Sequence, residues 1–144
     1  MSYVNLSDNL APFQIAYYVS SSNTEITSTS TTWANTDISI TPPQGTYVFM
    51  YTGSLFCEGA GATIGQTRLT KNNVEIPGTN KQTRNTVVMV LGLIGGNNID
   101  AGACATSGVV SCNGTEVIRL QLSRGGSGSN INLRNRSLIM IKVS

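Results

Sequence analysis

The feature that most limits how this chain can fold is the recurrence of short, alternating segments between clusters of turn-forming residues. Strand-length segments separated by Gly, Asn, Pro and Ser follow one another along the chain, a pattern typical of β-proteins. Windows of about a dozen residues with helical apolar spacing are all interrupted by Gly, Pro or β-branched runs. The predicted strands are 13–19, 25–29, 36–41, 46–56, 62–70, 86–94, 99–106, 115–123, 130–133 and 137–143.

About ten short strands predict an all-β sandwich or barrel of antiparallel strands. The 144 residues contain no internal repeat and no linker, and a chain of this length suits one domain with a proper core. We therefore expect a single domain over residues 13–144, preceded by an N-terminal arm over residues 1–12.

Three of the predicted strands are apolar on both faces, which a two-layer sandwich does not require. In the first of them, Tyr47, Phe49 and Tyr51 point to one side and Val48 and Met50 to the other. The three strands are 46–56, 86–94 and 137–143. A sandwich has one interior, and no helix is expected to cover a second apolar face.

The remaining cover for a second apolar face is another copy of the chain, because burial at about 25 cal/mol per Å² would drive association. We predict an interface between copies. Its predicted residues are Tyr47, Phe49, Tyr51, Met89, Leu91, Leu138 and Met140. The other interpretations of the three aromatic residues are a core position and a sugar-stacking platform. Trp33 either closes the end of the sandwich or forms an exposed anchor.

Charge is sparse and unevenly placed. Only 11% of residues are charged, against roughly 25% in typical domains, and no Lys or Arg precedes Arg68. From Glu116 onward there are five basic residues, one acidic residue and no aromatic residue, so the aromatic and basic footprint of nucleic-acid binding is missing. We expect no nucleic-acid partner, and we expect the basic C-terminal and acidic N-terminal parts to lie near each other.

The sequence favours no catalytic or metal site. Without His, a Ser-His-Asp or Cys-His arrangement cannot form, and the commonest zinc ligand is lacking. The Gly-rich stretch at 59–65 does not have phosphate-loop spacing. The stretch at 124–129 is interpreted as a flexible hairpin tip, and contact with a ligand is the alternative. We expect no enzyme, no metal and no cofactor. The enzymatic alternative is a glycosidase pair that the fold would assemble from the seven acidic residues.

The cysteines and the first residues of the chain indicate in which cellular compartment the protein is made. Cys57, Cys104 and Cys112 are too few for a disulfide framework. Reduced, buried thiols are expected, and a bridge between Cys104 and Cys112 is the alternative. The first residues lack the basic and apolar parts of a secretory signal, and no apolar run approaches the ~20 residues that span a bilayer. We expect synthesis in a host cytoplasm without a signal peptide, and no membrane.

Four segments together resemble a known family. They are "TSTTWANTDISITPPQGTYVFMYTGSL" at 29–55, "RLTKNNVEIPGT" at 68–79, "NGTEVIRLQLSRGG" at 113–126 and "NRSLIMIKV" at 135–143. Their turns and alternation resemble the C1q/TNF-like trimeric jelly roll over roughly residues 13–144. The resemblance implies a ten-stranded jelly roll whose inner sheet packs about a three-fold axis. Thr115-Glu116 stands where that family often has Gly-Asp, which weakens any expectation of a metal-binding loop there.

The resemblance implies a function only at the level of classes, because the family includes secreted signalling proteins, spore-surface proteins and bacteriophage structural proteins. We expect a homotrimeric head decoration (cement) protein of a bacteriophage, which lies on the capsid surface of the virion and binds the major capsid protein. The alternative is a receptor- or glycan-binding knob of a phage fibre or spore-surface trimer. Such knobs usually follow a shaft, and the chain has neither heptads nor a G-X-Y repeat.

The arm at residues 1–12 is the predicted capsid contact. Its apolar residues are Tyr3, Val4, Leu6 and Leu10. This segment cannot bury enough apolar surface to fold alone. It is either a disordered tail or an arm that becomes ordered on a neighbouring protein.

Overall fold

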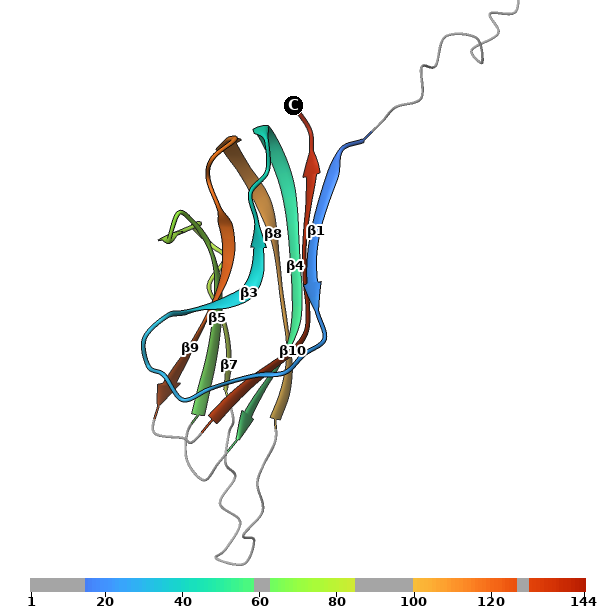
Figure 1. The fold of residues 1–144 in the computed structure, drawn as a ribbon. Helices are drawn as coiled ribbons and strands as arrows, with labels where there is room; N and C mark the ends of the chain where they lie inside the picture. Colours follow the sequence, from blue (N-terminus) through green and yellow to red (C-terminus); the bar gives the residue numbers. More distant parts are fainter. Residues whose placement is uncertain (1–14, 59–62, 85–99, 127–129) are drawn as a thin grey trace, which may run out of the picture.

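The computed structural model describes residues 15–58, 63–84, 100–126 and 130–144 of the chain (Figure 1). Within these ranges there are ten strands and no helix. The strands are β1 (Tyr17–Ser22), β2 (Ile26–Ser28), β3 (Ala34–Ile40), β4 (Gln44–Glu58), β5 (Thr63–Lys71), β6 (Val74–Glu75), β7 (Lys81–Arg84), β8 (Asp100–Asn113), β9 (Ile118–Gly126) and β10 (Asn130–Lys142). The prediction of an all-β fold is confirmed.

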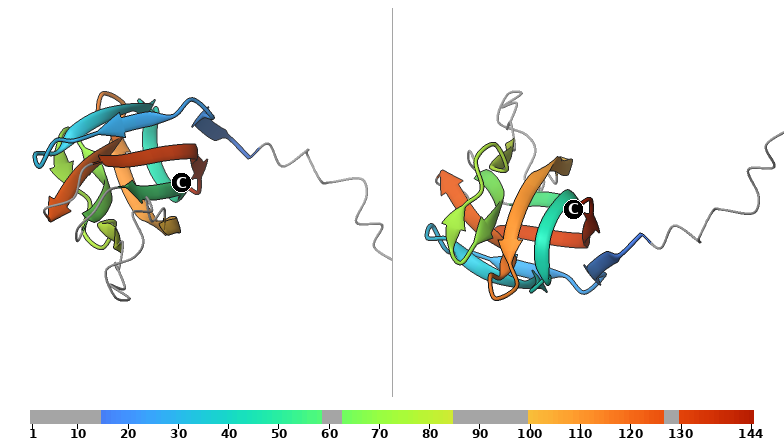
Figure 2. Two further views of the ribbon diagram at one scale, coloured as in Figure 1. Left: turned by 90° about the horizontal axis from the view of Figure 1, so that it is seen from below. Right: turned by 90° about the horizontal axis from the view of Figure 1, so that it is seen from above.

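The strands form two sheets, which we name sheet A and sheet B. Sheet A has the order β1-β10-β4-β8, with β2 paired to β10. Sheet B has the order β3-β9-β5-β6, with β7 paired to β5. All these pairings are antiparallel, and the end-on views show the sheets as two opposed layers (Figure 2). Because the chain passes repeatedly from one sheet to the other and its first and last strands are neighbours, the fold is a jelly-roll sandwich.

Two elements of sheet A differ from the sequence prediction. β8 continues to Asn113, beyond the predicted end at residue 106, and it pairs with β4 without a register shift. β10 is one strand where two were predicted, with an irregularity in the pairing between Arg134 and Ser137 and a positive φ of 47° at Asn135. Tertiary pairing along the whole of β4 overrides the turn-like local composition of these segments. The predicted strand at 86–94 lies outside the described residues.

The core lies between the sheets and follows from the alternation of side chains along each strand. On sheet A, Tyr47, Phe49 and Tyr51 of β4 point inward, and on sheet B the inward side chains include Leu120 and Leu122 of β9; all five are buried. The buried apolar residues are Ile38, Ile40, Tyr47, Phe49, Tyr51, Leu55, Cys57, Leu69, Ile76, Cys104, Val110, Cys112, Ile118, Leu120, Leu122, Ile131, Leu133, Leu138 and Met140. The inward face of each sheet therefore finds its cover within the chain.

Two local sequences allow this packing. A Cβ at Gly108 would lie 2.7 Å from the Phe49 ring, so the glycine opposite Phe49 on β8 makes room for the ring. Asn72 and Asn73, with φ of 50° and 67°, form the two-residue turn between β5 and β6. Such turns need positive φ at both positions, which Asn tolerates better than most residues.

Candidate binding surface

The predicted interface residues that the structure describes lie on the inward face of sheet A. Tyr47, Phe49 and Tyr51 of β4 and Leu138 and Met140 of β10 are each at most 1% exposed and belong to the core. Buried in this way, they are not available to another copy, so the face that the sequence analysis assigned to the interface needs correction. The reason is that alternation defines two faces of a strand but does not say which one meets the opposite sheet.

The other predicted site residues lie outside the described residues. These are Met89 and Leu91 of the predicted interface and Tyr3, Val4, Leu6 and Leu10 of the predicted arm. Their predicted roles stay predictions.

The outward face of sheet A carries two rows of apolar side chains that cross the sheet. In the first row, Tyr17, Ile141, Val48 and Val109 are neighbours across β1, β10, β4 and β8. Tyr17 is 67% exposed and Val109 is 63% exposed. Folding of a single chain thus leaves Tyr17 and Val109 largely in water, while Ile141 and Val48 between them are partly buried.

The second row is apolar on three of its four strands. Val19, Ile139 and Met50 are followed on β8 by Ser107, and Met50 is 43% exposed. We call the two rows together the apolar half of sheet A. Two residues beyond the first row, Ile15 precedes Tyr17 and Val143 follows Ile141. Both are also exposed.

The apolar half ends abruptly at the next row. Ser21, Ser137, Thr52 and Ala105 are neighbours across the same four strands. Further along, Ser54 of β4 lies between Arg134 of β10 and Ala103 of β8. We call these two rows the polar half of sheet A, since they carry hydroxyls, single methyl groups and the exposed Arg134 side chain.

The outward face of sheet B is covered by side chains of the same chain. The Arg68 guanidinium lies over the Trp33 ring, 4.2 Å from its centroid, and its Nη1 contacts Glu75 at 3.2 Å. Arg68 Nε donates a hydrogen bond to Gln121 at 2.9 Å, and the Gln121 amide donates to Asn35 at 2.9 Å. Trp33 therefore packs under Arg68 on the outward face of sheet B, which differs from both predicted roles, at the sandwich end or as an exposed anchor. Only 6% of Gln121 stays exposed.

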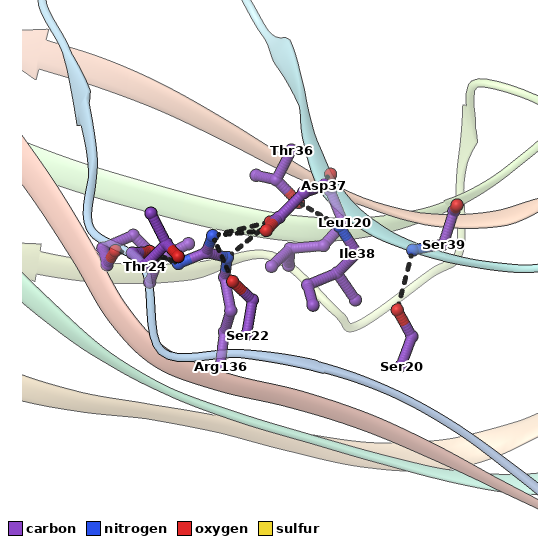
Figure 3. A network of polar contacts seen from close by, with 10 residues as sticks. Ser20, Ser22, Thr24, Thr36, Asp37, Ile38, Ser39, Leu120 and Arg136 are labelled. Atoms are coloured by element: carbon purple, nitrogen blue, oxygen red, sulfur yellow. Dashed lines mark hydrogen bonds and ion pairs between the residues drawn. The ribbon is translucent and has the colours of Figure 1, made fainter.

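A buried arginine connects the two sheets at their β10 and β3 strands (Figure 3). Arg136 donates from Nε and Nη2 to the two carboxylate oxygens of Asp37, each at 2.7 Å. It also donates to the Thr24 and Leu133 carbonyls and to the Ser22 hydroxyl. Burial of Asp37 raises its pKa, but the hydrogen bonds from Arg136 and Ser22 and the charge of Arg136 outweigh this, so the net pKa is lowered.

The contact between Arg136 and Asp37, together with the exposed pair of Arg134 and Glu25, confirms that the basic C-terminal and acidic N-terminal parts lie near each other. Both pairs use side chains from β10. Sequence reasoning gave the proximity of the two parts but not the burial of Arg136.

Four acidic residues of the described ranges, Glu25, Asp37, Glu75 and Glu116, each form an ion pair with Lys or Arg. No cluster of three or more His, Cys, Asp or Glu able to hold a metal occurs among the described residues. None of the described residues belongs to a helix long and apolar enough to cross a membrane.

All three cysteines are buried and unbridged. Burial raises the pKa of the Cys104 thiol, which contacts the Tyr51 hydroxyl at 3.2 Å. Burial likewise raises the pKa of Tyr51. Burial also raises the pKa of the Cys112 thiol, which favours the protonated form of both Cys104 and Cys112. The alternative of a Cys104–Cys112 bridge is wrong, because both thiols are free.

Comparison with known proteins adds little to this description. No protein-family model matches the sequence, and no curated protein matches it. Among solved structures, the chain is similar to the Eiger TNF of S. frugiperda with 10% identity and a TM-score of 0.38. The similarity covers 70% of this chain and 62% of that one, so this chain spans less than two thirds of the neighbour's length. The fold assignment rests on the strand order.

The residues of the apolar half were visible in the sequence, although they were not assigned to an interface. Val48 and Met50 stand on the opposite face of β4 from the aromatic residues. Tyr17 and Val19 alternate within a predicted strand. Only Val109 lay outside the predicted strands, beyond the expected end at residue 106.

Proposed function

We propose that this chain is a structural protein of a bacteriophage virion, a homotrimer that decorates the head and binds the major capsid protein. The observation that supports the proposal is the apolar half of sheet A, which the chain itself leaves uncovered. An uncharged apolar surface of this kind is typical of contact between proteins. The sparse charge of the chain and its resemblance to trimeric jelly rolls favour a virion protein.

The proposed mechanism is stabilisation by added contact. A protein that binds only the assembled shell shifts the equilibrium toward that shell by mass action. Three copies that assemble through sheet A would bring three identical surfaces to neighbouring capsid subunits. Their affinities combine when the geometry lets all three bind at once.

The engagement of four of the seven acidic side chains supports a non-catalytic role for those four. A glycosidase needs one carboxylic acid and one free carboxylate that face each other across a substrate. Glu25, Asp37, Glu75 and Glu116 are instead paired with basic side chains.

The experiment that tests the proposal is the copy number of this chain in purified particles of the phage that encodes it. The chain and the major capsid protein are quantified from the same particles. A ratio of one, or a simple fraction of one, is expected for a head decoration protein. A handful of copies would instead indicate a fibre or vertex knob, and absence from the particles would contradict a virion function.

The oligomeric state is tested separately, by sedimentation or light scattering of the purified chain. A mass of three chains is expected. A monomer at high concentration would contradict the homotrimer, whatever the copy number shows.

A further inference from the structure

We propose that the free edge of β8 is a docking site for an extended segment of another protein, which adds to sheet A as a further antiparallel strand. Among the described residues, β8 is the last strand in the order of sheet A. The inference concerns a different surface from the apolar half, and it stands whether or not the chain is a virion protein. The contact depends on main-chain groups rather than on an apolar face.

The first step is the direction of the backbone groups along β8. Thr46 of β4 bonds to the end of β10 with both its N–H and its carbonyl, at 2.9 and 2.8 Å. Its partner Ser111 on β8 therefore directs its own backbone groups away from β4. The pairing of β4 and β8 has no register shift, so every second residue of β8 repeats this direction. The residues concerned are Ala103, Ala105, Ser107 and Val109.

The second step is that these groups have no partner in the part of the chain that the structure describes. There, β8 pairs only with β4. The Ser111 carbonyl accepts a hydrogen bond from Lys71 Nζ at 3.2 Å, which closes the edge at that end. From Ala103 to Val109, about 20 Å along the strand, no described backbone group bonds to this edge. Each residue that faces the edge presents one donor and one acceptor.

The third step is that β8 lacks the features that usually protect a free edge. Proteins keep such edges from pairing by charged side chains, proline, bulges or short length. β8 spans 14 residues, and residues 101–112 contain neither a charged residue nor proline. The edge strand on the other side of sheet A, β1, has six residues, and its Ser20 hydroxyl accepts a hydrogen bond from Ser39 of sheet B at 3.3 Å. The edge of β8 is therefore a template for pairing with another chain.

The fourth step is the kind of partner that fits. Donors and acceptors at strand spacing are matched by another extended backbone. The outward side chains of Ala103, Ala105 and Ser107 are small and exposed, so a neighbouring strand has room for large side chains. Val109 adds an exposed apolar neighbour at one end. Arg134, the charged side chain in the row of Ala103, lies two strands away and is engaged in an ion pair.

A second copy of β8 fits this edge less well than a short segment does. Pairing of two β8 strands over their whole length would displace the Lys71 side chain from the Ser111 carbonyl. A segment of about seven residues instead spans the edge from Ala103 to Val109 and ends before Lys71. The partner is therefore a short extended segment with large, uncharged side chains on its outward face.

The first experiment measures amide hydrogen exchange along β8 in the purified chain by NMR. Ala105, Ser107 and Val109 direct their N–H groups to the open edge, whereas Thr106 and Gly108 direct theirs to β4. The open-edge amides should exchange at least about 100-fold faster than the two paired amides. Equal protection at low concentration would show that the chain covers its own edge. Protection that grows with concentration would show that copies pair, and either result overturns the proposal.

The second experiment adds a peptide of about seven alternating Thr and Val residues. Its valines keep their N–H groups and its threonines are N-methylated, so only one edge of the peptide can bond. At millimolar concentration the peptide should slow exchange at the amides of Ala105, Ser107 and Val109 by about tenfold. The control is the same peptide with N-methyl groups on every residue. An equal effect of the control, or no effect of the first peptide, would contradict strand addition.

Two substitutions at one position test the contact from the side of the chain. Ser107→Pro removes an N–H that points to the open edge and leaves the bonds to β4 in place, so it should abolish the effect of the peptide on Ala105 and Val109. Ser107→Thr keeps the N–H group and should retain the effect. Circular dichroism verifies that both variants are folded. A full response of folded Ser107→Pro would overturn the proposal, and if this variant does not fold, the fully methylated peptide decides.

Discussion

The outward faces of the two sheets differ in how far side chains of the same chain cover them. Sheet B covers its own face, because Trp33 and Arg68 lie over it and leave Gln121 only 6% exposed. Sheet A carries side chains such as Tyr17 and Val109 that stay more than half exposed. The contrast teaches that, among the described residues, exposed apolar side chains gather on the outward face of sheet A, whereas sheet B exposes Val74 of β6.

The difference extends to the kind of group on each face. On sheet B, the planar side chains of Trp33, Arg68 and Gln121 contact each other or hydrogen-bond within the chain. These groups therefore need no partner from another protein. The apolar half of sheet A has no such partner in the described residues. We therefore expect partner binding to depend on sheet A and to be insensitive to changes on sheet B.

The largest effect is expected where the two faces of β4 are compared directly. Phe49→Ala removes a buried ring and should lower the free energy of unfolding by about 3–5 kcal/mol at every protein concentration. Met50→Ala truncates an outward side chain and should cost the isolated chain less than about 1 kcal/mol. Urea unfolding at several concentrations measures both. An equal loss for the two variants at low concentration would contradict the assignment of the faces.

A slightly smaller effect is expected at the ion pair that joins the two sheets. Asp37→Ala leaves the Arg136 guanidinium, which is 0% exposed, without its carboxylate, and should cost about 3 kcal/mol of unfolding free energy. The control is Glu25→Ala, which breaks the exposed pair with Arg134 and should cost at most about 1 kcal/mol. Thermal unfolding of both variants ranks the two pairs. Similar losses would mean that burial of Arg136 does not matter.

On sheet B, Trp33→Ala should have a moderate effect on stability and none on association. Loss of the ring removes the stacking of Arg68 and part of the cover of Gln121, which should cost about 1–2 kcal/mol. The matched control is Val74→Ala. Val74 of β6 is 71% exposed, so its truncation should change the free energy of unfolding little. Dissociation of the oligomer by Trp33→Ala would contradict the separation of roles between the sheets.

The smallest effect is expected from acid. The pKa of Asp37 in the folded chain lies below its ordinary value of 3.8, so the ionised carboxylate stabilises the folded state above pH 3.8. This stabilisation is lost as the pH falls below 3.8 through the lowered folded-state pKa. The difference in unfolding free energy between the unmodified chain and Asp37→Ala should therefore shrink in that range. A difference that stays constant down to the acid transition would contradict the ion pair as its cause.

Much of the architecture was accessible from local patterns. Alternation along 46–56 and 115–123 predicted strands that the structure contains, and the turn at Asn72 and Asn73 was visible from residue type. The ends of β8 and the continuity of β10 were not, because small and polar residues such as Gly108 and Asn135 weaken the local signal while pairing with β4 maintains the strand. The weak local strand preference of these segments is outweighed by their hydrogen-bonded pairing with β4, which is distant in the sequence.

The candidate binding surface also depends partly on local sequence pattern and partly on tertiary structure. By itself, the sequence determined that β4 and β10 have two apolar faces, since alternation with a period of two is a property of the extended chain. Only the tertiary structure decided that Tyr47, Phe49 and Tyr51 face sheet B and that Val48 and Met50 face water. It also decided that Tyr17, Ile141, Val48 and Val109 form one row, because that row depends on strand order and register between segments far apart in the chain.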